Sequence, residues 1–430
     1  MRVLVLGGYG FIGAEIVRAL GANGFGAIGL GRDEDLGRRL LPTAEWIGAD
    51  ISALDAPEKW EPLLSNIDAI VNAAGALQDG ARDRLSAVHD VSIRACAAAA
   101  TRAGVKTFVQ ISATGAEKDA PTAFMRTKSS GDACLRESAL DWVILKPGLV
   151  IGPNAYGGTA LLRMLAGFPL ILPLVHGEAR LQTVAIGDVA DAVIAALKGE
   201  IPMRADYDLV EEESHSLREI VRAMRGAQGF AAPLAEINLP RIVGDAVSLC
   251  ADVAGLLGWR SPLRSTAMTV IAGGVTGDSR PWREARGRPL RTLAESLGLL
   301  RSSAQERAFA RVELILPVML LTLSAFWIAS GVIGVLERES AAGNLAAFDA
   351  PTAMGFVIAG SLVDLWIGAG LLWRPFAKMA AIASALVAGA YLCLGSILAP
   401  ALWLDPLGVY VKVIPAIVLS VALALLLQER

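Results

Sequence analysis

Three glycines near the N-terminus have the spacing that phosphate-binding turns use. A short apolar run leads into Gly7, Gly10 and Gly13, and apolar residues at helical spacing follow, so we expect a buried strand, a tight turn and a helix. In such a turn the first glycine permits the bend, the second lets backbone amides approach a pyrophosphate, and the third lets the helix pack closely on the strand. Phe11 and Ile12 open that helix, and we expect them to contact the same ligand. A plain glycine turn of any α/β protein is the alternative.

Further candidate contacts to a nucleotide follow the next strands. A carboxylate after the second strand would bind the ribose of NAD, but Gly31 and Arg32 stand there, which favours the 2′-phosphate of NADP. The alternative is that Arg32 pairs with the acidic residues at 33–35. After the third strand, Asp50 is either a contact to adenine or the N-cap of a helix, and Ile51 follows it at the same edge. We therefore expect NADP, with NAD as the other possibility.

Alternating strands and helices must hold these residues together. The apolar runs that read as buried parallel strands lie at 3–6, 25–30, 67–73, 105–111 and 140–147, and a helix is expected over 82–103. Such alternation is typical of an α/β Rossmann-type doubly wound parallel sheet, whose ligands lie at the carboxyl ends of the strands. Ala73, Ala74 and Gly75 end one of these strands, and their small side chains let the backbone approach the cofactor.

The composition sets bounds on the class of protein. The chain has 430 residues, of which 54% are hydrophobic, and a mean hydropathy of +0.51, which predicts membrane segments. A net charge of −3 without a basic stripe argues against nucleic-acid binding. Four widely spaced cysteines and three histidines predict neither a disulfide framework nor a metal site. The apolar run at the N-terminus is too short for a signal peptide.

Together these motifs resemble the short-chain dehydrogenase/reductase superfamily in its extended or atypical form. The resemblance covers roughly residues 1–230. It rests on the glycine triplet, Asp50-Ile51, Asn72–Gly75, Gln110–Ala113, Lys146–Gly148 and Ile186–Ala190.

The resemblance implies a catalytic group formed by a serine and a Tyr-x-x-x-Lys pair. In the family the lysine holds the nicotinamide ribose and lowers the pKa of the tyrosine, which protonates the oxygen of the acceptor. Ser112 and Lys128 match the serine and the lysine, but Phe124 stands in place of the tyrosine. Pro147 is a further implied cofactor contact. Tyr156 is either a substitute acid or an ordinary loop aromatic.

The missing tyrosine leaves two functions open. In the first, NADP(H) still passes hydride, to an acceptor such as a quinone that takes protons from water. In the second, the nucleotide is a structural or sensory ligand, as in the atypical members that resemble the nucleotide-binding accessory subunit of respiratory complex I. Whether the chain is an enzyme therefore stays open at this point.

Three regions follow from the pattern along the chain. We assign residues 1–235 to the nucleotide-binding Rossmann domain, 236–310 to a small substrate lid and linker region, and 311–430 to a membrane domain. The stretch 236–275 is apolar but broken by charges, so it cannot span a bilayer. It fits either an amphipathic lid or a surface lying against the membrane.

Four apolar stretches predict an all-α four-helix transmembrane bundle. They lie at 312–336, 353–373, 376–398 and 409–427, and each is long enough to cross roughly 30 Å of hydrocarbon. The positive charges that set the orientation are Arg301, Arg307, Arg311, Arg374, Lys378 and Arg430. They place both termini and the nucleotide domain in the cytoplasm.

These four stretches resemble the DoxX-like membrane family, some members of which are linked to quinone-coupled oxidation. The resemblance rests on the hydropathy of the four helices and on the motifs at 362–368 and 405–415. Asp364 lies near the middle of the second stretch, where a charge is costly, so we expect it to pair with Lys412. Such a pair either fixes helix packing or lines a small polar pocket.

The sequence thus predicts a membrane-anchored NAD(P)H-dependent oxidoreductase with a small-molecule or lipophilic acceptor. The alternative is a non-catalytic scaffold or assembly factor for a membrane complex, with a partner in that complex.

Overall fold

The computed structural model describes residues 1–80, 84–154, 156–300, 303–343, 345, 347–406 and 408–427. The chain packs into two compact units, which are considered separately. The first contains Met1–Asp252 and Ser261–Ala310, and the second contains Val253–Arg260 and Arg311–Arg430. The division of the chain at residues 235 and 310 stays a prediction.

The first unit is built on a seven-stranded sheet in which all neighbouring strands are parallel. In spatial order the strands are β11 (Ala205–Leu209), β6 (Asp141–Pro147), β5 (Thr107–Ile111), β4 (Ala69–Asn72), β1 (Arg2–Leu6), β2 (Gly26–Gly31) and β3 (Glu45–Gly48). Successive strands run outward from β1 on one side and from β4 on the other. This reversal creates a crevice at the carboxyl ends of β1 and β4, where doubly wound sheets bind their ligands. The predicted Rossmann-type sheet is confirmed.

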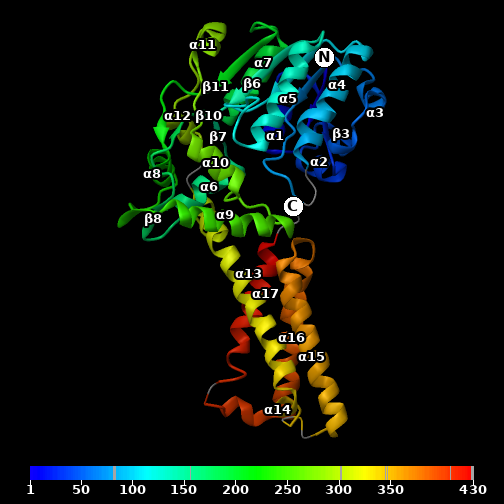
Figure 1. Ribbon diagram of the computed structural model, residues 1–430, viewed down its shortest axis with the longest axis vertical. Coiled ribbons are helices and arrows are strands. Elements are labelled where there is room, and N and C mark those ends of the chain that lie inside the picture. The colour runs from blue at the N-terminus through cyan, green and yellow to red at the C-terminus, as the bar shows by residue number, and fades with distance from the viewer. Residues whose placement is uncertain are drawn as a thin grey trace. The chain divides into compact units, whose positions relative to one another are not determined.

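Helices cover both faces of this sheet (Figure 1). The helices before residue 300 are α1 (Phe11–Ala22), α2 (Glu34–Leu40), α3 (Pro57–Trp60), α4 (Ser92–Ala103), α5 (Ala123–Glu137), α6 (Gly157–Ala166), α7 (Ile186–Leu197), α8 (Leu217–Ala227), α9 (Arg241–Leu256), α10 (Ser265–Gly273), α11 (Arg280–Arg286) and α12 (Leu293–Gly298). Alternate residues of β1 point to opposite faces: Val3 and Val5 pack with α1 and α7, and Leu4 and Leu6 pack with α4. The first residues of the predicted helix at 82–103 lie outside the described residues.

A smaller lobe with its own core completes the first unit. Three two-stranded sheets contribute to it: β7 (Leu149–Ile151) with β10 (Thr183–Ala185), β9 (Arg180–Leu181) with β12 (His215–Ser216), and β8 (Ile171–Leu174) with β13 (Ala235–Asn238). The carboxylate of Glu211, which is buried, accepts hydrogen bonds from the amide of Thr183 at 2.9 Å and from the amide of Leu293 at 2.6 Å. This contact ties α12 to the lobe.

The second unit is a bundle of helices, most of them apolar. They are α13 (Ala304–Leu336), α14 (Arg338–Gly343), α15 (Ala350–Leu372), α16 (Arg374–Leu398) and α17 (Val413–Leu426). Among the described residues, α13, α15 and α16 are long and apolar enough to cross a membrane, whereas α17 has 14 residues. The predicted stretch 409–427 is helical only from Val413, because Gly408 has φ +62° and residues 408–412 form turns. At 1.5 Å per residue α17 is about 21 Å long.

The polar partner predicted for Asp364 is wrong. Its carboxylate accepts hydrogen bonds from Ser330 of α13 at 2.6 Å and from Tyr391 of α16 at 3.1 Å. Lys412 instead precedes α17 as its N-cap residue. Two hydroxyl groups on neighbouring helices therefore satisfy the buried carboxylate, which a lysine near the end of a helix does not reach. Arg301 and Arg430, two of the predicted orienting charges, lie outside the described residues.

Candidate nucleotide site

The glycine loop between β1 and α1 leaves no room for side chains. Gly7 has φ +72°, and a Cβ there would lie 2.9 Å from the Cα of Ala74. A Cβ on Gly13 would lie 2.1 Å from the carbonyl oxygen of Gly7. α1 begins at Phe11, and no side chain caps it at Gly10. The first-turn amides of α1, including that of Ile12, are therefore available to an anion, as a dinucleotide pyrophosphate requires.

At the outer end of the crevice, Arg32 follows β2 and is exposed. Two of the acidic residues that follow it also make contacts of their own, and a pairing of Arg32 with the acidic residues at 33–35 stays open. Asp33 caps α2 by accepting from the amide of Leu36 at 2.9 Å, and Glu34 forms an ion pair with Arg38. A Cβ on Gly31 would lie 2.2 Å from the ring of Tyr9, so β2 ends on a residue that must have no side chain.

Asp50 caps a short helical turn in the structure. Its carboxylate accepts from the amide of Ser52 at 3.0 Å and from the hydroxyl of the same residue at 2.8 Å, and Ile51 beside it is buried. The N-cap role that the sequence allowed is thus present. A contact to adenine stays a prediction for Asp50 and Ile51.

At the inner end, hydrogen bonds fix the turn after β4. Asn72 donates to Gln110 at 2.8 Å and accepts from the amide of Ala74 at 3.0 Å, which shapes the turn that Ala73 begins. A Cβ on Gly75 would lie 3.3 Å from the Nζ atom of Lys128. The structure therefore brings together three of the small residues and the lysine that the sequence assigned to one site.

Lys128 is buried at the carboxyl ends of two strands. Its Nζ donates to the carbonyl oxygens of Ile111 at 2.8 Å and of Ala74 at 3.2 Å. Burial lowers the pKa of Lys128 to about 8. A lysine held here without a salt bridge among the described residues still has a third donor for a ligand hydroxyl.

Ser112 faces a buried carboxylate that sequence reasoning missed. Its hydroxyl donates to Oδ2 of Asp132 at 2.5 Å, and Oδ1 of Asp132 is buried without a hydrogen-bond partner among the described residues. Burial raises the pKa of Asp132, while the hydrogen bond from Ser112 and the charge of Lys128 act against that rise. The signal in the sequence was the position of Asp132 one helical turn after Lys128.

Phe124 packs against a second residue that sequence reasoning missed. His89 lies on a π-helical turn, Ala87–Val91, and its ring meets that of Phe124 edge to face, with centroids 5.7 Å apart. Nε2 of His89 accepts from the amide of Ala76 at 3.1 Å, so the ring proton is on Nδ1, which lies 2.9 Å from the hydroxyl of Thr127. Burial and the charge of Lys128 lower the pKa of His89 to about 2, so this ring stays neutral and supplies no proton at ordinary pH.

The remaining predicted residues lie at the rim of the crevice. Pro147 ends β6, and its carbonyl oxygen accepts from the amide of Thr114 at 3.2 Å. Tyr156 is exposed, and its ring stacks on Phe11 with centroids 6.1 Å apart. Tyr156 thus lies beside the start of α1, and its role as an acid stays open. No cluster of three His, Cys, Asp or Glu residues suited to a metal occurs in the described part of the chain.

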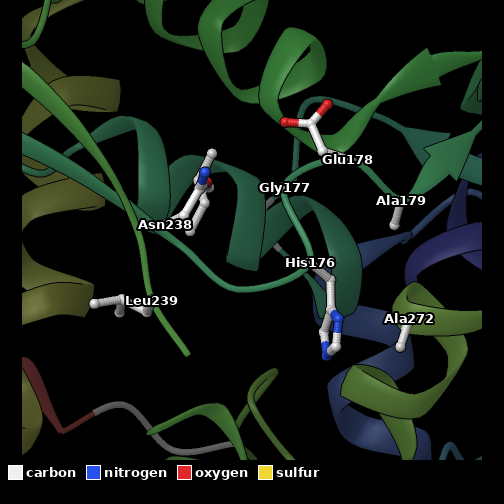
Figure 2. A pocket seen from close by; sticks show the side chains of 8 residues that line it. His176, Gly177, Glu178, Ala179, Asn238, Leu239 and Ala272 are labelled. Atoms are coloured by element: carbon white, nitrogen blue, oxygen red, sulfur yellow. The ribbon is translucent and has the colours of Figure 1, made fainter. Parts of the chain in front are cut away.

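A separate hollow of about 260 Å³ lies in the smaller lobe (Figure 2). Its lining shares no residue with the nucleotide site and consists of Leu174, His176, Gly177, Glu178, Ala179, Asn238, Leu239 and Ala272. In Figure 2 His176 and Glu178 point to different sides of the loop that carries them. Arg218 binds Glu178 at 2.9 Å and Asn238 at 2.5 Å, so these two polar side chains of the hollow help to hold the lobe together.

Comparisons with known proteins agree with this geometry. Residues 7–200 match a family model described as NAD(P)H-binding, and residues 324–421 match one described as a DoxX-like family. The sequence is 22% identical to a ceramide reductase of Caulobacter vibrioides, over 56% of this chain and 75% of that protein. It is 26% identical to an NAD(P)H azoreductase of Xenophilus azovorans, over 68% of this chain and 96% of that protein.

A respiratory-complex protein is also similar. NADH dehydrogenase [ubiquinone] 1 alpha subcomplex subunit 9 of Dictyostelium discoideum is 23% identical over 55% of this chain and 65% of that protein. Among solved structures, UDP-glucose 4-epimerase of Thermotoga maritima matches with a TM-score of 0.52 at 19% identity, over 72% of this chain and 99% of that one. The enzyme WbmH of Bordetella bronchiseptica, in complex with NAD+, matches with a TM-score of 0.51 at 18% identity, over 72% of this chain and 98% of that one.

These structures share the fold. The two family matches identify an NAD(P)H-binding domain of the atypical short-chain dehydrogenase/reductase kind at 7–200 and a DoxX-like domain at 324–421, and the chain is distantly related to the complex I subunit.

Proposed function

We propose that the protein is a membrane-anchored oxidoreductase that uses NADP(H) and reduces a lipophilic acceptor. The observation that carries this proposal is the buried position of Lys128 beside Gly75, at the carboxyl ends of β4 and β5. Burying a lysine charge is costly, and burial has lowered the pKa of Lys128 accordingly. A buried lysine beside the glycine loop supports the proposal that the bound nucleotide transfers hydride.

The chain offers groups for each part of the nucleotide. The amides of Phe11–Gly13 would hold the pyrophosphate, since the amide of Gly10 already donates to the carbonyl oxygen of Gly7 at 2.9 Å. The Arg32 guanidinium would hold the 2′-phosphate of NADP. Asp50 and Ile51 would border the adenine. Lys128, the turn Ala73–Gly75 and Pro147 would border the nicotinamide ribose. When bound, the nucleotide supplies hydride.

Three described residues near Lys128 supply no proton to an acceptor, which supports an acceptor that needs none from the protein. Phe124 has no proton to give, the proton of His89 lies on Nδ1 beside Thr127, and the hydroxyl of Ser112 is bound to Asp132. An acceptor that takes its protons from water, such as a quinone, needs no acid from the protein. A lipophilic acceptor is supported by the long apolar helices α13, α15 and α16 and by the similarity to a protein named as a ceramide reductase.

A scaffold or assembly factor for a membrane complex is the second candidate. It is supported by the Phe124–His89 contact, which fills the position of the family tyrosine with packed rings. The similarity to a subunit of the respiratory NADH dehydrogenase points the same way. In this case the nucleotide would be retained and never oxidised.

The test follows the absorbance of reduced nicotinamide in the full-length protein, purified in lipid nanodiscs and loaded with NADPH. Addition of a short-chain quinone is expected to oxidise the bound NADPH, and Lys128→Met is expected to abolish the reaction. Tyr156→Phe tests the rim tyrosine: unchanged turnover excludes it as the acid. Retention of NADPH without oxidation, in both the natural protein and Phe124→Tyr, would overturn the oxidoreductase and favour the scaffold.

A further inference from the structure

Helix α9 (Arg241–Leu256) turns its large apolar side chains outward. Ile242, Leu249 and Leu256 are 75%, 65% and 72% exposed, and their spacing of seven residues places them on one face of the helix. Ala246, Cys250 and Val253 on the same side are also exposed. A helix on the surface of a water-soluble protein has the opposite arrangement, with its apolar stripe facing the core.

The buried side of α9 consists of small residues. They are Gly244, Ser248, Ala251 and Gly255, which follow one another at intervals of three or four. A Cβ on Gly244 would lie 2.9 Å from Cγ1 of Val175, so the helix backbone packs directly on the lobe. Only small side chains permit this close approach, and rotating the helix would force its large residues into that contact.

Polar contacts also fix the rotation of α9. The carboxylate of Asp252 accepts hydrogen bonds from Gln78 at 3.0 Å, from Arg264 at 3.3 Å and from the amide of Ser265 at 3.3 Å. All four residues belong to the first unit. The contacts of Asp252 therefore hold one side of α9 against the first unit, and they fix the apolar face in its exposed position.

The end of α9 packs within the second unit. Residues Val253–Arg260 belong to that unit, where the indole of Trp259 donates to the carbonyl of Leu372 at 2.7 Å. The amide of Arg374 donates to the carbonyl of Leu257 at 3.0 Å. Leu372 and Arg374 flank the tight turn between α15 and α16.

This turn has the features of a membrane interface. Trp373 and Phe376 are exposed there, with ring centroids 4.9 Å apart, at the ends of two apolar helices. Tryptophan is enriched where spanning helices reach the headgroup region. The last turn of α9, with exposed Val253 and Leu256, belongs to the same unit as this turn.

We propose that α9 is an interfacial helix whose apolar face inserts into the lipid layer. The occupant is lipid because the last turn of α9 belongs to the same unit as the spanning helices and their turn at Trp373, and the apolar face of this one helix of 16 residues is about 24 Å long. The exposed face is aliphatic and lacks the tyrosine, tryptophan and arginine side chains that are enriched at protein–protein interfaces. The inference does not depend on hydride transfer.

A native cysteine provides the probe. Cys250 is exposed on α9, whereas Cys96 is buried, so the variant Cys134→Ser with Cys393→Ser leaves one reactive thiol for a nitroxide label. In full-length protein in phospholipid nanodiscs, oxygen is expected to relax the label more strongly than a water-soluble nickel chelate. The expected depth is about 5–10 Å below the phosphates.

Three further labels provide matched controls, each with Cys250→Ser added. Leu40→Cys replaces an exposed leucine on the charged helix α2 and is expected to give a label accessible to the nickel chelate. Asp245→Cys lies on α9 next to the apolar stripe and is expected to be shallower than Leu249→Cys. A label at Cys250 as accessible to nickel as that at position 40 would overturn the proposal. Shielding from both reagents would also overturn it, since a second copy or another protein would then cover the face.

Discussion

At the scale of single residues, the burial of Lys128 links stability to pH. Its pKa falls from 10.5 to about 8 in the folded chain. Below that pH, folded and unfolded chains both carry the proton, and the folded chain bears the cost of a buried charge. Between about pH 8 and 10.5 the folded chain has released the proton and the unfolded chain retains it, so the free energy of unfolding rises with pH in this window.

Lys128→Met is expected to separate stability from binding. Removing the buried charge should raise the free energy of unfolding of the nucleotide-free protein near neutral pH by up to about 3 kcal/mol. The same change should weaken NADPH binding, because a donor to the ribose is lost. Thermal unfolding in detergent and NADPH titration measure the two effects. The difference in free energy of unfolding between the variant and the natural protein should shrink as the pH rises toward 10. A difference that stays constant, or an unchanged affinity for NADPH, would contradict this assignment of Lys128.

Sequence reasoning at this scale found the residues whose roles depend on local spacing. Gly7, Gly10 and Gly13 lie within one turn, and Ser112 and Lys128 were found through the resemblance to a family. His89 was missed because its contact with Thr127 joins residues 38 positions apart, and no local pattern records that contact. The burial of Asp132 likewise depends on how α5 packs on the sheet.

At the scale of elements, the approach of α1 to β1 depends on Gly13. Gly13→Ala would place a Cβ 2.1 Å from the carbonyl oxygen of Gly7. The nearest atoms belong to the backbone, so relieving the clash requires the turn or the helix to move. We expect a loss of at least about 2 kcal/mol of stability and of NADPH binding. Gly21→Ala on the same helix meets nothing within 4 Å and should be neutral or stabilising by up to about 1 kcal/mol. Equal effects of the two substitutions on thermal stability and NADPH affinity would rule out a role for the tight turn.

In the bundle, Asp364 joins three helices through its two hydroxyl partners. Asp364→Asn keeps the shape but can accept with only one oxygen, so one hydrogen bond is lost at about 0.5–1.5 kcal/mol. The thermal midpoint should fall modestly, and Ser330→Ala should produce a fall of similar size. Unchanged quinone-dependent oxidation of NADPH in both variants is the expected result for a packing role. Turnover lost without any fall in the midpoint would instead assign Asp364 to the chemistry.

The positions of strands and helices were more predictable than the contacts between side chains on different elements. The predicted strand runs agree with β1, β2, β4, β5 and β6 because buried parallel strands are continuous apolar segments. The last predicted membrane stretch was too long, since hydropathy does not register the turns that end at Lys412. The pairing of Asp364 was wrong because charge suggested Lys412, whereas the structure satisfies the carboxylate with hydroxyl groups.

At the scale of the whole molecule, the distribution of charge predicts orientation. Arg307 and Arg311 precede the first long apolar stretch, and Arg374 and Lys378 follow the second. From the positive-inside rule we expect the nucleotide domain to face the cytoplasm. Protease added to intact cells should leave this domain whole, and protease added after permeabilisation should digest it. Digestion of the domain in intact cells would reverse the orientation.

The most direct measurement is the identity of the nucleotide that the purified full-length protein carries. Mass spectrometry of the fraction released by denaturation is expected to find NADP(H), close to one molecule per chain, and Gly13→Ala should lose most of it while Gly21→Ala retains it. Absence of any pyridine nucleotide from protein that still binds none when NADPH and NADH are supplied would contradict the central claim that the glycine loop holds a dinucleotide. NAD(H) at the same stoichiometry would keep that claim and overturn the role of Arg32.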